Sequence, residues 1–358
     1  MDAQMLIGVA QAMLIGILLI VCLNLYLIFR LKDLDPFAKW DPNAVNGALL
    51  LLFIIAGLPA AFLSSMAWSK EMVMTYNAAS EHGQVIDNMF WWTMAVAVFV
   101  TVLTNILLFY FSWKYRYREG QKALYYPHNN RIEVLWTVVP AIVLTALVLR
   151  GVIVWNDVTG PAPDNALNIE LNGKQFAWTA RYPGSDLEFG ETSVFLINEA
   201  KGNSLGFNLD DKRGFDDLVV SELVIPVNTD IELKIRSRDV LHSATLMHFR
   251  VKMDAVPGMT TRFHFKPTIT TADMRLQTGN DAFEYEMSCQ QICGGGHWNM
   301  RLPVRVVTME EYKAWLAQQK TFIASYRELN PEKPAAPAPA TQETPAPDQT
   351  ASAQTVVH

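Results

Sequence analysis

Four long apolar runs fill the first half of the chain. They occupy residues 6–29, 48–68, 90–113 and 134–155. A membrane-spanning helix needs about 20 consecutive apolar residues, and all four runs are long enough. Tryptophans crowd the ends of several runs, where interfacial aromatic belts lie, and membrane helices tolerate internal prolines such as Pro59 and Pro140 as kinks. The pattern therefore predicts four transmembrane helices.

The loops between these runs differ in positive charge. Those after the first and third runs are rich in Lys and Arg, whereas residues 69–89 contain only Lys70. Because positively charged loops stay in the cytoplasm, the N-terminus, the second loop and everything after Trp155 are expected outside. The first residues, MDAQ, lack the positive charge of a signal peptide, so the first run is expected to be a retained helix.

The second half of the chain alternates between apolar and polar residues over short runs. Gly, Pro, Asn and Asp separate runs at 166–171, 173–182, 221–227, 230–237, 248–253 and 301–307. Several short strands at close spacing predict a β sandwich or barrel. Residues 309–329 have a helical pattern, whereas residues 331–358 lack large apolar side chains and are predicted to be disordered.

Acidic charge is concentrated in this second half. Residues 1–155 carry 10 Lys or Arg and 9 Asp or Glu, while residues 156–358 carry 19 and 26. The negative electrostatic potential of this excess acidic charge suits a basic protein partner and repels nucleic acid, so we expect no nucleic-acid binding.

The segment SCQQICGGGHWNM, residues 288–300, gathers metal-binding side chains. Cys289 and Cys293 are two of only 3 cysteines in the chain, and His297 and Met300 follow them closely. Thiolate and thioether ligands with an imidazole favour copper in an electron-transfer role. A disulfide would close a very small loop and leave the His and Met unexplained, and a zinc site would not recruit Met. Copper is the preferred interpretation, with the disulfide and zinc as alternatives.

Two thiolates can bridge two copper ions if each ion also has its own imidazole. Only His297 is local, so a second His must come from elsewhere. The candidates on the outer side are His242, His248, His264 and His82. Spacing alone does not choose among them.

Three segments together resemble subunit II of the haem–copper cytochrome c oxidases. They are NNRIEVLWTVVPAIVL (129–144), DVLHSATLMHFRVKMDAVPG (239–258) and CQQICGGGHWNM (289–300). The resemblance implies an all-β, cupredoxin-like Greek-key barrel attached to membrane helices. The implied organisation is two extra membrane helices in 1–83, the family's transmembrane hairpin in 84–158, the barrel in 159–308, a C-terminal helix in 309–330 and the disordered tail in 331–358.

The family's dinuclear copper centre, called CuA, implies the ligands residue by residue. His242, in DVLHS, would hold one copper, Cys289 and Cys293 would bridge both ions, and His297 would hold a copper. Met300 and the backbone carbonyl of Gln291 would be the weak ligands. His248 and His264 do not fall on ligand positions and are assigned to the surface or to packing.

The resemblance also implies roles for residues beyond the copper ligands. Glu133 matches an acidic residue at the mouth of a proton path into subunit I, although an interfacial carboxylate paired with Arg131 or a neighbouring Lys is the structural alternative. Phe176 aligns with the family's electron-accepting Trp, and Trp178 follows two residues on; either could receive electrons. Gln291 stands where the family has a Glu that helps bind magnesium, so that site is expected to be weak or absent. Residues 267–289 exceed the family's usual link and are expected to form an added loop near the copper.

The implied function is that of a terminal-oxidase subunit. It would accept electrons from a c-type cytochrome at CuA and pass them to haem in subunit I, where oxygen is reduced to water and protons are pumped. Implied partners are subunit I, subunit III, membrane lipid and a cytochrome that is free, membrane-tethered or part of a supercomplex. The expected location is a bacterial inner membrane with the C-terminal domain on the periplasmic side. The alternative is the CuA subunit of a membrane nitric oxide reductase.

Overall fold

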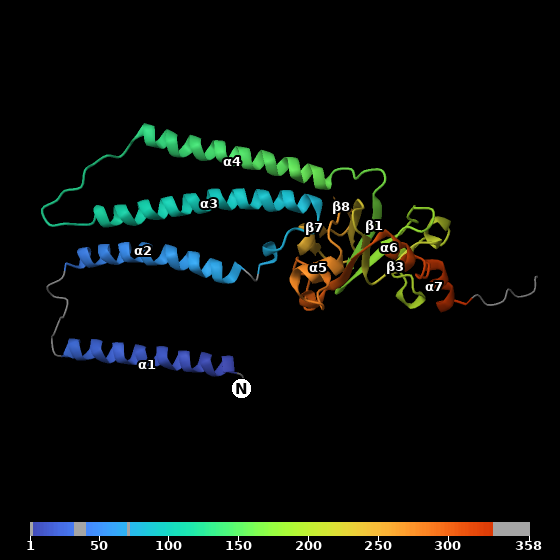
Figure 1. The fold of residues 1–358 in the computed structure, drawn as a ribbon, viewed down its shortest axis with the longest axis horizontal. Helices are drawn as coiled ribbons and strands as arrows, with labels where there is room; N and C mark the ends of the chain where they lie inside the picture. The colour runs from blue at the N-terminus through green and yellow to red at the C-terminus, as the bar shows by residue number, and fades with distance from the viewer. Residues whose placement is uncertain (1–2, 32–40, 70–71, 332–358) are drawn as a thin grey trace, which may run out of the picture. The chain divides into compact units, whose positions relative to one another are not determined.

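The structure, a computed structural model, describes residues 3–31, 41–69 and 72–331 (Figure 1). They form two compact units, which we treat separately. The helical unit contains the described residues up to Tyr76 and Ile86–Ile153, and the β unit contains Asn77–Val85 and the described residues from Val154 onward. The tail predicted to be disordered lies outside the described residues, apart from its first residue.

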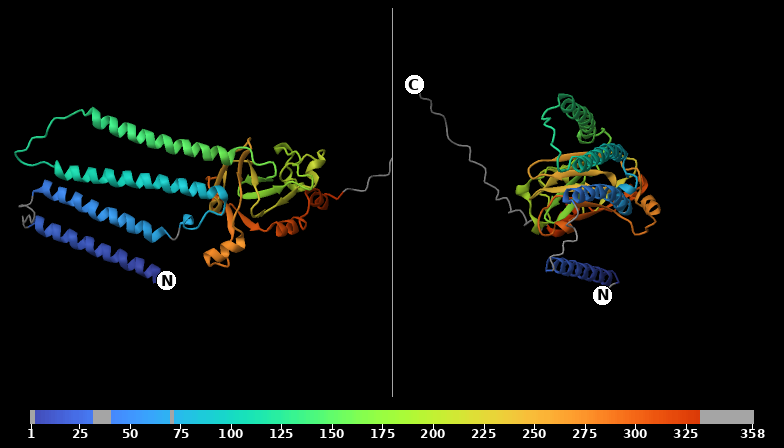
Figure 2. Two further views of the ribbon diagram at one scale, coloured as in Figure 1. Left: turned by 45° about the horizontal axis from the view of Figure 1, so that its top comes forward. Right: turned by 90° about the vertical axis from the view of Figure 1, so that its left-hand side faces the viewer.

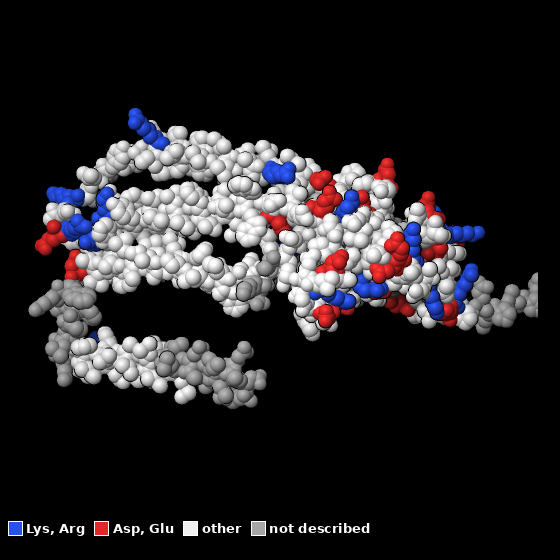
Figure 3. All heavy atoms as spheres, in the orientation of Figure 1, with Lys and Arg blue, Asp and Glu red and all other residues white. Residues whose placement is uncertain are grey.

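The apolar runs of the first half form long helices. They are α1 (Ala3–Leu31), α2 (Pro42–Trp68), α3 (Glu81–Lys114) and α4 (Asn130–Thr159). In the described residues, α2, α3 and α4 are long and apolar enough to cross a membrane, and α1 contributes a shorter apolar stretch, Gly16–Leu31. Three of the four predicted spans are therefore confirmed as capable of spanning. On the face shown in Figure 3, charged side chains are few along these helices and dense over the β unit.

Local sequence explains where these helices begin and why they continue. Asp41 caps α2 by accepting a hydrogen bond from Asn43 N–H at 2.9 Å, and Pro42 occupies the first turn, where no backbone N–H is needed. Pro59 lies inside α2 and Pro140 inside α4, and neither ends its helix.

The described residues of the β unit contain ten strands. They are β1 (Leu167–Lys174), β2 (Ala177–Tyr182), β3 (Leu218–Val220), β4 (Leu223–Pro226), β5 (Ile231–Ser237), β6 (His242–Leu246), β7 (Val251–Ala255), β8 (Thr261–Phe265), β9 (Tyr285–Cys289) and β10 (Arg301–Val307). One sheet has the order β3-β2-β1-β5-β8 and the other the order β4-β10-β9-β6-β7. The predicted barrel is thus two five-stranded sheets without a shared ladder. They curl around one interior, as expected for a cupredoxin-like domain (Figure 2).

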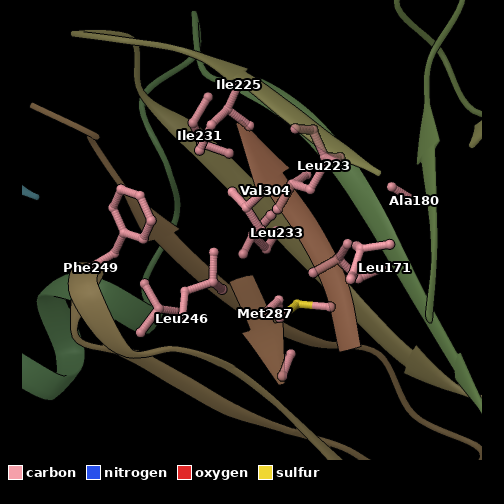
Figure 4. Close-up of a cluster of buried hydrophobic side chains, with 14 of the residues drawn as sticks. Leu171, Ala180, Leu223, Ile225, Ile231, Leu233, Leu246, Phe249, Met287 and Val304 are labelled. Carbon is pink, nitrogen blue, oxygen red and sulfur yellow. The ribbon is translucent and has the colours of Figure 1, made fainter. Parts of the chain in front are cut away.

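Apolar side chains at alternate positions along the strands fill this interior. Along β5, Ile231, Leu233 and Ile235 are fully buried and the residues between them are partly exposed. Leu246, Met287 and Val304 come from the other sheet and meet them in the same cluster (Figure 4). Burying each such side chain contributes about 1.5–3 kcal/mol, which makes this shared core a rigid base for the loops at its edge.

Short helices complete the fold. They are α5 (Thr271–Thr278), α6 (Met309–Leu316) and α7 (Phe322–Leu329), with single 3-10 turns η2 (Val73–Thr75), η3 (Val194–Leu196), η4 (Glu199–Lys201), η5 (Lys212–Phe215), η6 (Met247–Phe249) and η7 (His297–Asn299). The single helix predicted for 309–330 is therefore wrong: Thr321 caps a second helix by accepting a hydrogen bond from Ala324 N–H. The prediction of an added loop over 267–289 is also only partly right, because this range contains the helix α5 and the strand β9.

The run GKQFAWTARY, interpreted as one strand, is a tight hairpin. Gly173 and Lys174 end β1, the chain turns at Gln175 and Phe176, and Ala177 begins β2. Lys174 lies opposite Ala177, and Gly173 lies opposite Trp178. The turn could not be recognised from the sequence, because it contains an apolar residue, whereas turns usually contain Gly, Asn or Asp.

The boundary predicted at residues 83–84 also differs from the structure. Ala79 N–H donates to the His248 carbonyl at 2.8 Å, and Ser80 forms a β-bridge with Pro267. Residues 77–85 therefore belong to the β unit. The small residues of this segment, Ala78, Ala79 and Ser80, are buried.

Candidate metal centre

The cysteine-rich segment forms the connection between β9 and β10. Cys289 is the last residue of β9, and Arg301 is the first of β10. Cys289 N–H donates to the Met300 carbonyl at 3.1 Å, so the loop returns to the point where it started. Cys289, Cys293 and Met300 are buried at this point, whereas His297 is only partly buried.

The structure brings the six predicted ligand positions together. The Cys289 and Cys293 sulfurs are 4.0 Å apart. Cys289 Sγ lies 3.8 Å from His242 Nδ1 and 3.2 Å from the Gln291 carbonyl oxygen. Cys293 Sγ lies 3.6 Å from His297 Nδ1 and 3.8 Å from Met300 Sδ. The cluster thus has two halves, one imidazole and one weak donor on each side of a pair of sulfurs.

The distance between the sulfurs fits metal binding and not a disulfide. A disulfide bond is about 2.05 Å long, and both cysteines are free. Metal–thiolate bonds are about 2.3 Å long in zinc proteins, so one ion can bind two sulfurs only if they are less than about 4.6 Å apart. At 4.0 Å the two sulfurs meet that condition. Two thiols, two imidazoles and a thioether are the donor set that copper prefers.

The metal-free Cys293 thiol favours its protonated form. Burial, followed by the neighbouring Cys289, raises the pKa of Cys293 to about 11. A metal ligand must be the thiolate, so binding at neutral pH must release a proton from this residue.

The His242 ring is held by a carboxylate. His242 is fully buried at the start of β6, and its Nε2 lies 2.8 Å from Asp239 Oδ1. With Nε2 occupied by Asp239, Nδ1 is the nitrogen that faces Cys289. The Trp178 ring packs edge-on against the His242 ring, with 5.8 Å between the ring centroids. Such partners fix the orientation of a metal-binding imidazole.

Asp239 itself stays ionised in this position. Burial would raise its pKa, but hydrogen bonds from Gln175 N–H, the His242 ring and Val240 N–H outweigh burial and lower the pKa below its usual value. Asp239 is therefore a reliable acceptor for the imidazole.

Strand pairing selects His242 from the four candidate histidines. β6 pairs with β9, which places Ala244 opposite Cys289. His264 lies on β8 in the other sheet, opposite Glu232, and His248 packs edge-on against Phe283 and Tyr285. His82 lies against Phe263 at 5.2 Å between ring centroids. Among the described residues, His242, Cys289 and Cys293 are the one group of three His, Cys, Asp or Glu side chains close enough to share an ion.

The two residues proposed to receive electrons lie in different environments. Phe176 is 41% exposed and its ring lies beneath Gly294 and Gly296 of the cysteine loop. Trp178 is 3% exposed and contacts His242. Sequence reasoning missed Trp298, a 75% exposed residue adjacent to His297. It also missed Asp239, which the Asp-x-x-His spacing could have indicated.

Glu133 lies in the first turn of α4, in the helical unit. Its carboxylate accepts a hydrogen bond from Asn129 N–H at 3.1 Å, and Glu133 N–H donates to the Asn129 carbonyl at 2.9 Å. The carboxylate thus stabilises a helix N-terminus, a favourable place for negative charge. The bond described for it is to the backbone and not to Arg131.

Fold and site together define a class: a membrane-anchored protein whose extramembrane, cupredoxin-like domain has a Cys/His cluster consistent with copper. Two family models match the chain, "Cytochrome C oxidase subunit II, transmembrane domain" over residues 67–152 and "Cytochrome C oxidase subunit II, periplasmic domain" over residues 167–307. The chain belongs to the cytochrome c oxidase subunit II family. The predicted family is therefore confirmed.

The relatives matched by sequence agree with this family. "Alternative cytochrome c oxidase subunit 2" of Bradyrhizobium diazoefficiens is 34% identical over 282 residues, which are 77% of this chain and 92% of the relative. "Cytochrome c oxidase subunit 2" of Cereibacter sphaeroides is 26% identical over 254 residues, 68% of this chain and 78% of the relative. The crystal structure of the periplasmic domain of cytochrome oxidase subunit II from Bradyrhizobium japonicum has 27% identity and a TM-score of 0.30, covering 43% of this chain and 94% of that one. These relatives are named as subunits of an oxidoreductase.

Proposed function

We propose that this chain is the electron-accepting subunit of a haem–copper oxidase. It takes electrons from a c-type cytochrome at a dinuclear CuA centre and passes them to haem in subunit I. There, oxygen is reduced to water and protons are pumped. The observation that carries this proposal is the convergence of His242, Cys289, Gln291, Cys293, His297 and Met300, whose donor atoms form one chain of distances between 3.2 and 4.0 Å.

Cys289 and Cys293 would hold two copper ions, which would supply a carrier able to spread one electron over both ions. The protein contributes rigidity. Five of the ligands come from one loop between two strands of the core, and His242 comes from the adjacent strand β6. Ligands that are already in place need little rearrangement when charge changes, and this favours fast electron transfer.

Water is kept away from most of the donor atoms. His242 is 0% exposed, Met300 1%, and each cysteine 5%. A partly buried His297 and an exposed Trp298 lie on the outer side of the loop. Electrons are proposed to enter through Phe176, which is 41% exposed, or through Trp178, which is buried against His242, as the resemblance implies.

The magnesium site of the family is proposed to be weak or absent. The Gln291 side chain is exposed, and an amide is a weaker ligand than a carboxylate for this hard cation. Gln291 serves copper through its backbone carbonyl alone, so replacing the family's Glu leaves the copper centre intact. Glu133 is proposed as the mouth of the proton path, where its hydrogen bond to Asn129 fixes the carboxylate.

Four spans are proposed in a bacterial inner membrane, with the β unit in the periplasm. The helices α3 and α4 form the family's hairpin, and α1 and α2 are an additional pair, since the transmembrane match begins at residue 67. The bridge of Ser80 to Pro267 supports a second loop on the same side as the β unit. An even number of added spans leaves this orientation unchanged. Subunits I and III and membrane lipid cover the helices, and the acidic charge of residues 156–358 suits a basic cytochrome, either free or tethered.

The test is copper analysis and electron paramagnetic resonance of the complex purified with this chain in place. Two coppers per chain and a seven-line hyperfine pattern, the signature of one electron shared by two copper nuclei, are expected. One copper per chain, or a Cys289–Cys293 disulfide in the working complex, would refute the proposal. Oxygen uptake with reduced cytochrome c separates an oxidase from the alternative, because a nitric oxide reductase would consume nitric oxide instead.

A further inference from the structure

The turn between β1 and β2 contacts both segments that supply ligands. Gln175 N–H donates to Asp239 Oδ2 at 2.8 Å, and Asp239 holds His242 through its other oxygen. The Gln175 side-chain Nε2 donates to the Cys293 carbonyl at 2.6 Å. One residue thus reaches the His242 segment with its backbone and the cysteine loop with its side chain.

The neighbouring residue makes a second contact with the same loop. A Cβ placed on Gly296 would lie 2.5 Å from the Phe176 ring, and one on Gly294 would lie 3.0 Å from Gln175 Nε2 and from Phe176. Gly296 therefore lets the loop approach the turn, and Gly294 also has a φ of 136°, which residues with a side chain rarely adopt. Gly295, between them, has open space around it. The glycines on either side of Gly295 thus fit against residues 175 and 176.

We propose that Gln175 is a positioning residue that fixes the two halves of the copper centre relative to each other. The inference rests on the proposed function. Each half has its own imidazole and weak donor, and the two sulfurs are their shared elements. Apart from those sulfurs, hydrogen bonds that run from Cys293 through Gln175 and Asp239 to His242 also connect the two halves. Without the Gln175 side chain, the cysteine loop loses its hydrogen bond to the turn whose backbone N–H holds Asp239.

The test replaces the side chain in the full-length chain within its purified complex. Gln175→Leu removes the donor at similar size. Gln319→Leu is the matched control, because Gln319 Nε2 also donates to a backbone carbonyl, that of Trp315, at 3.2 Å in α6 and outside the copper centre. The measurements are copper release to a chelator, the hyperfine pattern and the reduction potential.

For Gln175→Leu we expect about tenfold faster copper release and a pattern no longer typical of two equivalent nuclei, in the range found when partners of metal ligands are removed. Gln319→Leu should match the unsubstituted chain in all three. If Gln175→Leu does not fold, Gln175→Ala tests the same bond by truncation. A Gln175 variant with unchanged copper release, pattern and potential overturns the positioning role. If the unsubstituted chain itself lacks the two-copper signal, the proposed function fails instead.

Discussion

Asp239 Oδ1 lies 2.8 Å from His242 Nε2, and this contact turns the other ring nitrogen toward the Cys289 sulfur. The carboxylate accepts hydrogen bonds from two other groups, Gln175 N–H at 2.8 Å and Val240 N–H at 2.7 Å. It is thereby fixed in place before any metal binds.

Replacing Asp239 with Ala is expected to weaken copper binding by about 10–100-fold, the usual effect of losing a partner of a metal-binding imidazole. Asp239→Asn keeps an acceptor for His242 but places an NH₂ group toward either the ring or Gln175 N–H, so its effect should be smaller. Competition with a copper chelator measures both. Asp254→Ala is the control, since Asp254 is a half-exposed carboxylate whose ion pair with Lys252, at 3.4 Å, is outside the cluster. Equal affinity in Asp239→Ala and Asp254→Ala would contradict the role of Asp239.

Gly296 and Gly295 should respond very differently to alanine. A Cβ at position 296 would lie 2.5 Å from Phe176, whereas one at position 295 would meet nothing within 4 Å. Gly296→Ala is expected to displace the cysteine loop and reduce the copper retained after dialysis several-fold, and the cost of such overpacking is typically 1–3 kcal/mol. Gly295→Ala should retain copper as the unsubstituted chain does. Copper loss in both variants would mean that chain flexibility, and not contact with Phe176, explains the glycines.

Substituting the histidines one at a time tests which of them binds copper. His242→Ala removes the imidazole that lies 3.8 Å from Cys289 and should abolish the seven-line hyperfine pattern. His248→Ala and His264→Ala should leave the pattern nearly intact, because His248 packs on Phe283 and Tyr285 and His264 lies in the other sheet. Paramagnetic resonance of the three variants at equal copper load decides the matter. A normal pattern in His242→Ala would exclude it as a ligand.

His248 should also make the stability of the β unit depend on pH. Burial, and then the nearby Arg250, lower the pKa of His248 below its ordinary 6.5, while Glu286 opposes them. The unfolded chain therefore binds the proton at higher pH than the folded chain, and stability falls as pH drops below about 6.5. His248→Phe keeps an aromatic ring against Phe283 and removes this titration. Thermal unfolding is followed by circular dichroism. The difference in unfolding temperature between the two proteins should be smallest near pH 8 and grow towards pH 5, where the variant should be the more stable. Curves that stay parallel from pH 8 to pH 5 would show that His248 does not titrate on unfolding.

Periodicity and composition were enough for the larger elements. Long apolar runs predicted α2, α3 and α4 because the length of a membrane helix is set by the bilayer, and alternation predicted β5 and β10 because side chains on a strand point to opposite faces. The pattern failed where neighbours in space override it. The hairpin at Gln175 and Phe176 has no turn residues, and its geometry is held by bonds to Asp239 and Cys293, far away in the chain.

The sequence alone predicted the long apolar helices, several of the strands and the cysteine loop, since each depends on residues close together in the chain. It also predicted the family through segments that are local and distinctive. Which histidine faces the cysteines and which turn supports the loop were decided by tertiary structure. These contacts join residues 47 and 118 positions apart, and only the pairing of β6 with β9 and the packing of the β1–β2 turn on the loop bring them within bonding distance.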